Sequence, residues 1–238
     1  FCGVKRGGPL VGSEGGGITT KGGRLVHVPL AQIGGKGVFV KEVEAQLLDG
    51  TIDFAVHSLK DVPARLPEGL TIVATPKRAN PFDCLIWNDD KPFSGTAVPM
   101  VIGTSSVRRI NQLKTAFPDM SFMPIRGNIE TRLRKMKEEG LDGIVLAAAG
   151  LERMDYLKGL HTLMLEPEVC VPAIGQGIMA VQCREGDKEL MALLRGINDE
   201  AAAIACRTER FFLHRANGNC DLPIGGYEAG IGADASHG

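Results

Sequence analysis

The sequence predicts an α/β fold, and two observations carry that prediction. Between residues 100 and 148, short apolar runs alternate with segments of helical periodicity, each about ten residues long, as in βαβ units with a parallel sheet. The composition, 44% hydrophobic and 23% charged in 238 residues, suits one large globular domain or two ordinary ones. Because parallel strands end at one edge of their sheet, polar residues that follow them are candidates for a binding site.

The N-terminal part of the chain is rich in glycine. Residues 1–17 contain too many glycines for any periodic pattern, so we expect an irregular segment there, whereas residues 25–30 indicate a short strand. A helix is predicted over residues 38–48, with Gly50 placed as its stop. The GGKG turn before this helix could offer backbone N–H groups and Lys36 to an anion, but many helices simply begin after glycine, and both interpretations stay open.

The stretch from Thr51 to Pro63 is expected to begin as a strand and to end as a polar cluster. Apolar residues alternate over residues 52–56, and Pro63 prevents continuation of the strand. Four polar residues follow directly: His57, Ser58, Lys60 and Asp61. They could cap the turn, or they could belong to a site at the end of the strand.

The remaining elements follow from periodicity and from helix stop signals. Strands are predicted at residues 70–74, 100–103, 120–125, 143–148 and 178–182. Helices are predicted at residues 107–116, 129–139, 187–194 and 200–213, with a further one near Leu151. Pro118 and Gly140 are the expected stops of the first two helices, and Asp187 is placed to cap the third. The segment PAIGQG at residues 172–177 is predicted to be a crossover or hinge between domains.

Five arginines are expected near the carboxyl ends of the parallel strands. Arg108 and Arg109 stand at a helix start, where the dipole makes a cation unfavourable by about 0.3 to 1 kcal/mol unless an anion is bound. Arg126, Arg132 and Arg153 follow the next two strands. A guanidinium donates paired hydrogen bonds to carboxylates and phosphates. One such arginine could form a weak surface ion pair, but five at equivalent positions predict a polyanionic ligand.

Asp61 is a lone acid beside Lys60 in a cleft that is expected to be cationic. Nearby positive charge favours its carboxylate form, and burial opposes it. Asp61 could meet positive charge that develops in a substrate, or it could simply pair with Lys60. His57 has no evident orienting acid other than Asp61, so we expect a structural role for it.

The six cysteines show neither C-x-x-C spacing nor regular intervals, so we expect no zinc site and no disulfide framework. Reduced thiols and a cytoplasmic setting are expected instead. Four are expected to behave as small buried hydrophobes: Cys84, Cys170, Cys183 and Cys206. Cys220 lies in the turn-rich loop NGNCDLPIGGY, where a nucleophilic or attachment role is open.

The charge balance argues against one class of partner. With 27 basic and 28 acidic residues the formal net charge is -1, whereas a nucleic-acid-binding domain is normally basic. No apolar run approaches the length of about 18 residues that a membrane span requires, and the N-terminus lacks a signal-peptide layout. We therefore expect neither a nucleic-acid nor a membrane partner.

Seven segments together resemble the porphobilinogen deaminase family, also called the hydroxymethylbilane synthase family. They occur in the family's order and spacing between Pro29 and Tyr227: GGKGVFVKEVE, AVHSLKDVP, IGTSSVRR, IRGNIETRL, LAAAGLERM, PAIGQG and NGNCDLPIGGY. Such a set is far more specific than any single motif.

The resemblance implies a cytoplasmic, monomeric transferase of tetrapyrrole and heme biosynthesis. Such an enzyme joins four porphobilinogen molecules head to tail into hydroxymethylbilane, with release of ammonia at each step, on a dipyrromethane cofactor held by a cysteine thioether. By position, Cys220 resembles that cysteine. Asp61 resembles the catalytic aspartate, which helps to protonate the leaving amine and stabilises the cationic azafulvene.

The resemblance also assigns ligand-binding roles residue by residue, and it implies no metal. Residues that resemble the family's cofactor-binding set are Lys60, Thr104, Ser106, Arg108, Arg109, Arg126 and Arg132. Residues that resemble its substrate-binding set are Arg153, Gln176 and Lys36.

The family has two domains similar to periplasmic binding proteins and a small α+β third domain that carries the cofactor cysteine. By the resemblance, residues 1–76 and 177–196 form the first domain, residues 77–176 the second, and residues 197–238 part of the third. Residues 1–17 lack the family's opening strand and its T-R-x-S-x-L-A motif, and the family continues beyond the cysteine loop. The alternative expectation is therefore a truncated, inactive member or an anionic-ligand binding module.

Overall fold

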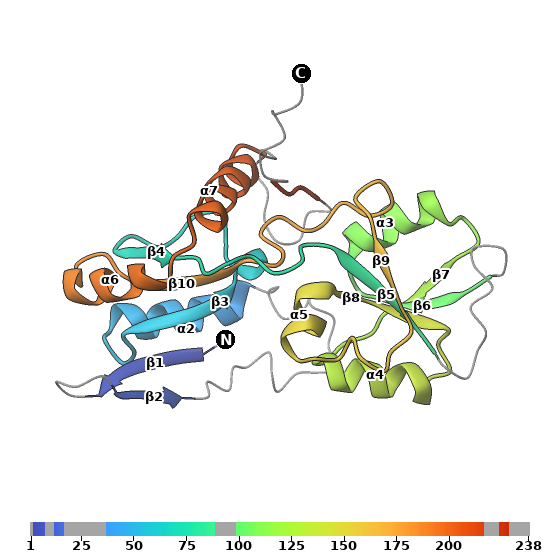
Figure 1. The fold of residues 1–238 in the computed structure, drawn as a ribbon, viewed down its shortest axis with the longest axis horizontal. Helices are drawn as coiled ribbons and strands as arrows, with labels where there is room; N and C mark the ends of the chain where they lie inside the picture. The colour runs from blue at the N-terminus through green and yellow to red at the C-terminus, as the bar shows by residue number, and fades with distance from the viewer. Residues whose placement is uncertain (1, 8–11, 17–36, 89–98, 217–223, 229–238) are drawn as a thin grey trace, which may run out of the picture. The chain divides into compact units, whose positions relative to one another are not determined.

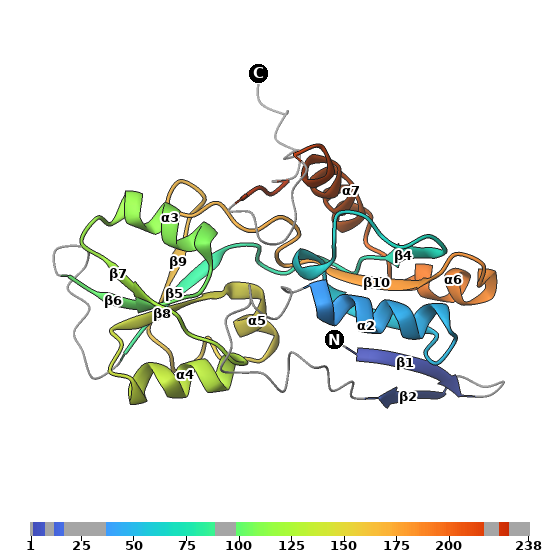
Figure 2. The same ribbon diagram turned by 180° about the vertical axis from the view of Figure 1, so that it is seen from behind.

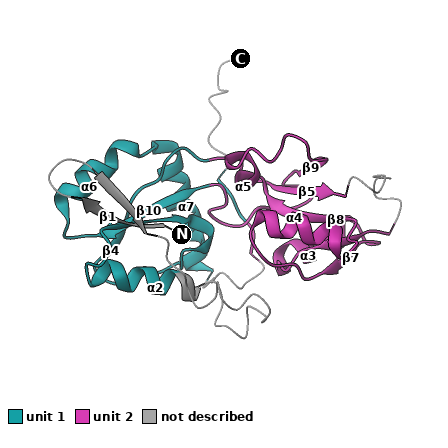
Figure 3. Ribbon diagram, turned by 90° about the horizontal axis from the view of Figure 1, so that it is seen from below, with its two compact units in different colours: residues 1–78, 178–220, 226–238 teal, residues 79–177, 221–225 magenta. Residues whose placement is uncertain are grey.

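The computed structural model divides the chain into two compact units (Figures 1 and 3). The described residues are 2–7, 12–16, 37–88, 99–216 and 224–228. Unit 1 comprises residues 1–78, 178–220 and 226–238, and unit 2 comprises residues 79–177 and 221–225. Within the described residues, each unit contains one five-stranded sheet. The division of the chain into three domains, with residues 197–238 in a domain of their own, stays a prediction.

Unit 1 is built on an antiparallel sheet with the strand order β2-β1-β3-β10-β4. Its strands are β1 (Cys2–Gly7), β2 (Gly12–Gly16), β3 (Phe54–Ser58), β4 (Leu70–Ala74) and β10 (Met179–Arg184). Strand β10 lies between β3 and β4, with Ala180 opposite His57 and Val181 opposite Ala74. The last three strands were predicted, but their antiparallel pairing was not.

The expectation that residues 1–17 are irregular is wrong for the described residues 2–7 and 12–16. Strands β1 and β2 form an antiparallel hairpin, and β1 also pairs with β3, where Val4 lies opposite Phe54. Strand pairing uses backbone N–H and C=O groups, which glycine also carries, so a glycine-rich segment can pair without an alternating side-chain pattern. The sequence pattern could not reveal the strand β1, because its pairing depends on the free edge of strand β3, which is distant in the sequence.

Helices cover both faces of the unit 1 sheet. They are α2 (Gly37–Leu48), α6 (Lys188–Leu194) and α7 (Glu200–Arg215), with the short 3-10 helices η2 (Leu59–Asp61) and η4 (Arg195–Ile197). Leu47 of α2 packs against Ala55, and Leu190 of α6 packs against Val181. The predicted helices are confirmed, and Asp187 caps α6 by accepting a hydrogen bond from the backbone N–H of Leu190.

Unit 2 is built on a mixed sheet with the strand order β7-β6-β8-β5-β9. Its strands are β5 (Asp83–Trp87), β6 (Val101–Gly103), β7 (Ser121–Met123), β8 (Gly143–Ala147) and β9 (Thr162–Leu165). The predicted parallel arrangement is confirmed for β7, β6 and β8. Strands β5 and β9 were not predicted, and β5 runs antiparallel to both of its neighbours. The apolar run of β5 is buried without alternation, so its pattern did not identify it as a strand.

The helices of unit 2 are α3 (Val107–Ala116), α4 (Ile129–Glu138) and α5 (Ala148–Arg153), and all three were predicted. Helices α3 and α4 lie on opposite faces of the sheet (Figures 1 and 2). Leu113 of α3 packs with Val145, and Met136 of α4 packs with Ile144, because neighbouring residues of a strand face opposite sides. Within the described ranges, no helix has both the length and the apolar character to cross a membrane.

Candidate active site

Lys60 and Asp61 lie in the 3-10 helix η2, which begins directly after strand β3. The backbone N–H of Leu59 donates to the carbonyl of Ile178 at 2.9 Å, and Leu59 is itself buried. The side chains of Lys60 and Asp61 are partly buried. The predicted polar cluster at the end of this strand is therefore present, on a turn whose backbone is fixed to the segment that leads into β10.

His57 belongs to a buried chain of three polar side chains in the same unit. Its Nε2 lies 2.8 Å from Oε1 of Gln182, and Nε2 of Gln182 donates to Oε1 of Glu44 at 3.0 Å. Burial lowers the pKa of His57 and raises the pKa of Glu44. A neutral imidazole with a fixed hydrogen-bond partner agrees with the structural role expected for His57.

In unit 2, the segments that follow β6 and β7 lie together at the carboxyl edge of the parallel strands. The backbone N–H of Thr104 donates to the carbonyl of Met123 at 2.9 Å, and Oγ of Ser105 donates to the carbonyl of Ile125 at 3.0 Å. The next residue, Arg126, is partly buried. Predicted site residues that are distant in sequence are thus brought to the same edge of the sheet.

Thr104 and Ser106 shape the start of α3. The hydroxyl of Thr104 accepts a hydrogen bond from the backbone N–H of Ser106 at 3.2 Å. The hydroxyl of Ser106 in turn caps the helix by accepting from the backbone N–H of Arg109. Both hydroxyls therefore help to hold the turn that presents Arg108 and Arg109.

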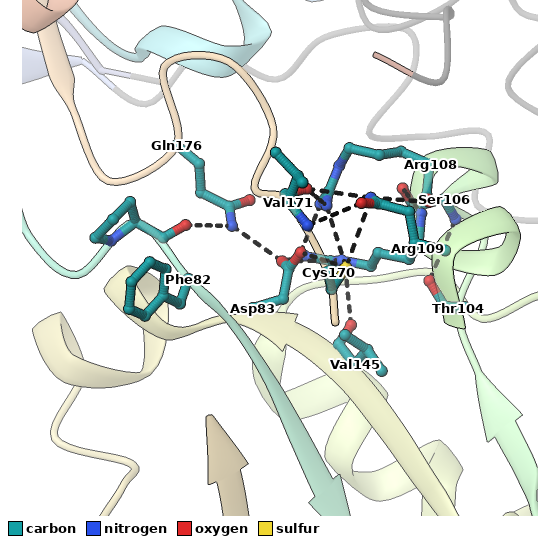
Figure 4. A network of polar contacts seen from close by, with 12 residues as sticks. Phe82, Asp83, Thr104, Ser106, Arg108, Arg109, Val145, Cys170, Val171 and Gln176 are labelled. Carbon is teal, nitrogen blue, oxygen red and sulfur yellow. Dashed lines mark hydrogen bonds and ion pairs between the residues drawn. The ribbon is translucent and has the colours of Figure 1, made fainter. Parts of the chain in front are cut away.

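Arg108 and Arg109 are buried, and both form ion pairs with Asp83 (Figure 4). Nη2 of Arg108 lies 2.7 Å from Oδ2 of Asp83, and Nη2 of Arg109 lies 2.6 Å from Oδ1. Burial alone would raise the pKa of Asp83, but the charges of Arg109 and Arg108 and the hydrogen bonds from Arg109 and Gln176 hold it well below its usual range. Asp83 is therefore an ionised carboxylate with no exposed surface.

The ion pairs with Asp83 change the expectation for Arg108 and Arg109. The position of two cations at the start of α3 suggests a bound anion, but Asp83 supplies an anion from within the protein. Arg108 and Arg109 are only 6% and 7% exposed. Two positive charges and one negative charge leave a net charge of one, so the group keeps part of its attraction for an anion. Contact between these arginines and a ligand stays a prediction.

Asp83 was missed because it stands at the beginning of a strand. Strand β5 is antiparallel to β8, which places Asp83 opposite Ala147, at the edge where the parallel strands end. The apolar run after Asp83 could have signalled a strand, but its direction could not be read from the sequence. An acid that precedes an apolar run can therefore share an edge with residues that follow parallel strands.

Gln176 and Cys170 complete the surroundings of Asp83. Nε2 of Gln176 donates to the carbonyl of Pro81 at 2.7 Å and to Oδ1 of Asp83 at 2.9 Å. The thiol of Cys170 donates to Oδ2 of Asp83 at 3.4 Å, and burial raises its pKa to about 11. Gln176 is buried, and its predicted contact with substrate stays a prediction.

Arg132 and Arg153 lie closer to solvent than Arg108 and Arg109. Nε of Arg132 donates to the carbonyl of Gly127 at 2.7 Å, and Nη2 of Arg153 donates to the carbonyl of Gly177 at 2.8 Å. Arg132 is partly buried and Arg153 is exposed. Both arginines are thus tied to the backbone of loops at this end of unit 2.

Two predicted site residues, Lys36 and Cys220, lie outside the described residues. Four other cysteines are buried and unbridged, as predicted: Cys84, Cys170, Cys183 and Cys206. Within the part of the chain that the structure describes, no group of three or more His, Cys, Asp or Glu side chains could hold a metal ion.

Comparisons with known proteins cover most of the chain. A family model described as porphobilinogen deaminase, dipyromethane cofactor binding domain, matches residues 12–192. A porphobilinogen deaminase of Listeria welshimeri is 49% identical over 218 residues, which cover 90% of this chain and 70% of the relative. One of Bacillus cereus (strain B4264) is 51% identical over 210 residues, which cover 88% of this chain and 68% of the relative.

Solved structures show a weaker likeness. An ancestral cationic amino acid solute binding protein is 14% identical, with a TM-score of 0.43, over 74% of this chain and 72% of that chain. A likeness of this size does not bear on the function.

Proposed function

The chain belongs to the porphobilinogen deaminase family, and we propose that Asp61 is its catalytic acid and Cys220 its cofactor-bearing residue. Porphobilinogen deaminase is a transferase of tetrapyrrole biosynthesis. It joins four porphobilinogen molecules head to tail into hydroxymethylbilane on a covalently bound dipyrromethane and releases ammonia at each step. The observation that carries the proposal of a ligand with several carboxylates is the excess of arginine at the carboxyl edge of the parallel strands of unit 2.

The residues present fit a cofactor that bears carboxylates. The buried group of Arg108, Arg109 and Asp83 retains one net positive charge, and the more accessible Arg126 and Arg132 add two more. When bound, dipyrromethane supplies the pyrrole to which the first substrate is joined. The residues that we propose hold it are Cys220 by a thioether and Lys60, Thr104, Ser106, Arg108, Arg109, Arg126 and Arg132 by polar contacts.

Arg153, Gln176 and Lys36 are proposed to bind the carboxylates of the substrate. Arg153 is exposed, and one of its nitrogens is held by the carbonyl of Gly177, which limits the directions in which the guanidinium can point. Each pyrrole unit adds two carboxylates, so the growing product needs more cations than one ligand would. Arginine suits this task because its planar fork donates two parallel hydrogen bonds to a carboxylate.

Asp61 is proposed to act where positive charge develops. It stands on η2, where the backbone N–H of Leu59 donates to the carbonyl of Ile178, so its carboxyl group is presented by a turn that is hydrogen-bonded to a neighbouring segment. The carboxyl group can give a proton to the leaving amine, and the resulting carboxylate stabilises the cation that remains when ammonia departs. Lys60, its neighbour, is proposed to hold a carboxylate of the cofactor.

We also propose a cytoplasmic monomer that binds neither nucleic acid nor membranes. The formal net charge of -1 supports the lack of nucleic-acid binding. Analytical ultracentrifugation would check the oligomeric state.

Intact mass spectrometry combined with a turnover assay tests the proposed function. The purified chain should carry the additional mass of dipyrromethane and should consume porphobilinogen, and Cys220→Ser should lose both properties. A folded chain without the adduct and without turnover would overturn the proposal. Such a chain would favour the alternative of an inactive member or an anionic-ligand binding module, which calorimetry with porphobilinogen would detect.

A further inference from the structure

We infer that Asp83 is a positioning residue that aims Arg108 and Arg109 at one carboxylate of a bound pyrrole. This inference rests on the proposed function, because that function supplies the carboxylate. Asp83 itself touches no ligand, since its carboxylate has no exposed surface. Its effect is exerted through the two guanidinium groups that it binds.

Both oxygens of Asp83 are occupied by donors from the protein. Oδ1 accepts from Nε and Nη2 of Arg109 at 3.0 and 2.6 Å and from Nε2 of Gln176 at 2.9 Å. Oδ2 pairs with Nη2 of Arg108 at 2.7 Å and accepts from the thiol of Cys170 at 3.4 Å. The two arginines are thus divided between the two oxygens, so that each fork has its own partner (Figure 4).

A second contact fixes each guanidinium on its other nitrogen. Nη1 of Arg109 donates to the carbonyl of Val145 at 2.8 Å, and Nη1 of Arg108 donates to the carbonyl of Val171 at 2.6 Å. Val145 lies on β8, and Asp83 begins β5. Because a guanidinium is planar, two contacts in different directions determine its orientation before any ligand arrives.

Charge and orientation make opposite predictions for the removal of Asp83. Asp83→Asn raises the net charge of the group from one to two, so attraction alone would strengthen the binding of an anionic pyrrole. Loss of orientation would weaken that binding. The asparagine amide has a single oxygen, which can accept from one of the two guanidinium groups, and its NH2 group would then face the N–H donors of the other arginine. The sign of the change therefore separates a positioning role from a simple charge effect.

The test compares Asp83→Asn with a matched control. Asp53→Asn removes a 2.7 Å ion pair with Arg184 in unit 1 and should leave both readouts unchanged. For Asp83→Asn we expect the fraction of chains that carry dipyrromethane to fall, or the KM for porphobilinogen to rise, by about tenfold or more. A fall in loading identifies a cofactor carboxylate, and a rise in KM with full loading identifies a substrate carboxylate. Unchanged or improved values in both readouts would overturn the inference.

A second pair of variants keeps the inference testable if Asp83→Asn alone does not fold. Arg109→Gln removes one buried cation and leaves Asp83 paired with Arg108, so the remaining charges balance. Adding Asp83→Asn to Arg109→Gln should reduce loading or raise KM further, because Nη2 of Arg108 then loses its ion pair and only the contacts of Nη1, such as that with the carbonyl of Val171, remain. Equal values for the single and double variants would contradict the inference.

Chemical modification tests the positioning of Arg108 without any turnover. Phenylglyoxal should modify Arg108 slowly in the unaltered chain and about tenfold faster in Asp83→Asn, as mapped by peptide mass. Equal rates would show that Asp83 does not hold Arg108. If the unaltered chain neither loads nor turns over, the proposed function fails, and this experiment still decides whether Asp83 fixes the arginine.

Discussion

His57 and Gln182, on the neighbouring strands β3 and β10, share a hydrogen bond of 2.8 Å, and Nε2 of Gln182 donates a second one to Glu44 of helix α2. All three side chains are buried. These hydrogen bonds join β3, the strand that leads to Asp61, with helix α2, which covers that strand. The stability of unit 1 is therefore linked to the protonation of Glu44.

We expect Glu44→Gln to flatten the pH dependence of stability. Burial raises the pKa of Glu44. A raised pKa means that the contribution of Glu44 is fully present below the ordinary glutamate value of about 4.3 and is lost as the pH rises through the folded-state value. The free energy of unfolding in urea, measured from pH 4 to pH 8, should fall more steeply for the unaltered chain than for Glu44→Gln. Glu42→Gln on the same helix is the matched control, and parallel curves for all three proteins would refute the assignment.

Asp83 should give the opposite pH dependence. Its pKa is held well below the usual range, so its contribution is present above the ordinary aspartate value of about 3.9 and is lost as the pH falls toward the folded-state value. At neutral pH we expect Asp83→Asn to destabilise the chain by about 3 to 5 kcal/mol, because two buried cations lose their partner. The difference between the two proteins should shrink below pH 4. Acid titration monitored by circular dichroism checks this, and a constant difference would be evidence against the ion pairs.

The contrast between Asp83 and the arginines shows what the sequence could predict. The parallel strands of unit 2 and their helices were predicted because regular periodicity reports which face of an element is buried. The positions of Asp61, Arg108 and Arg126 at strand ends followed from that pattern. The partner of Arg108 did not follow, because an ion pair between residues 83 and 108 depends on the direction of β5, and direction is a property of the fold.

The N-terminal hairpin was missed for a related reason. Periodicity describes side chains, and strand β1 is held by backbone pairing along β3, with Gly3 opposite Ala55. The antiparallel position of β10 between β3 and β4 was equally invisible, since it joins segments that are more than a hundred residues apart. Local patterns therefore predicted the elements, and the non-local pairing required the structure.

Gly127→Ala should destabilise unit 2 more than a comparable glycine substitution. Gly127 has φ +126, and an added Cβ would lie 2.5 Å from Cγ2 of Thr131. Gly140 also has a positive φ, but nothing lies within 4 Å of an added Cβ. We expect Gly140→Ala to cost about 1 kcal/mol and Gly127→Ala about 1 to 3 kcal/mol more. Urea unfolding of both variants checks the order, and equal losses would mean that the contact with Thr131 relaxes freely.

Asp61→Ala should remove turnover and leave the fold intact. The side chain of Asp61 is partly buried on η2, whereas the backbone of that turn is held by Leu59. We expect kcat to fall by about 10² to 10⁴ because proton transfer and stabilisation of the developing cation are both lost. Asp49→Asn, an exposed acid in the same unit, serves as the control. Near-full turnover in Asp61→Ala, with an unchanged circular dichroism spectrum, would remove Asp61 from the catalytic role.

Neutralising Arg126 or Arg132 should weaken cofactor assembly as well as turnover. Arg126 lies in the loop after β7, and Arg132 is held over the same loop by its hydrogen bond to the carbonyl of Gly127. If both hold carboxylates of the cofactor, Arg126→Gln and Arg132→Gln should lower the fraction of loaded chains by about tenfold, since a hydrogen bond to a charged group contributes about 1.5 to 3 kcal/mol.

Arg134→Gln is the matched control on helix α4. Arg134 lies two residues from Arg132 but is 60% exposed and pairs with Glu138 on the surface, where an ion pair contributes about 1 kcal/mol or less. Its loss should leave the loading measured by intact mass spectrometry unchanged. If Arg132→Gln and Arg134→Gln load equally well, the carboxylate does not lie at Arg132, and the excess of arginine at this edge serves another purpose.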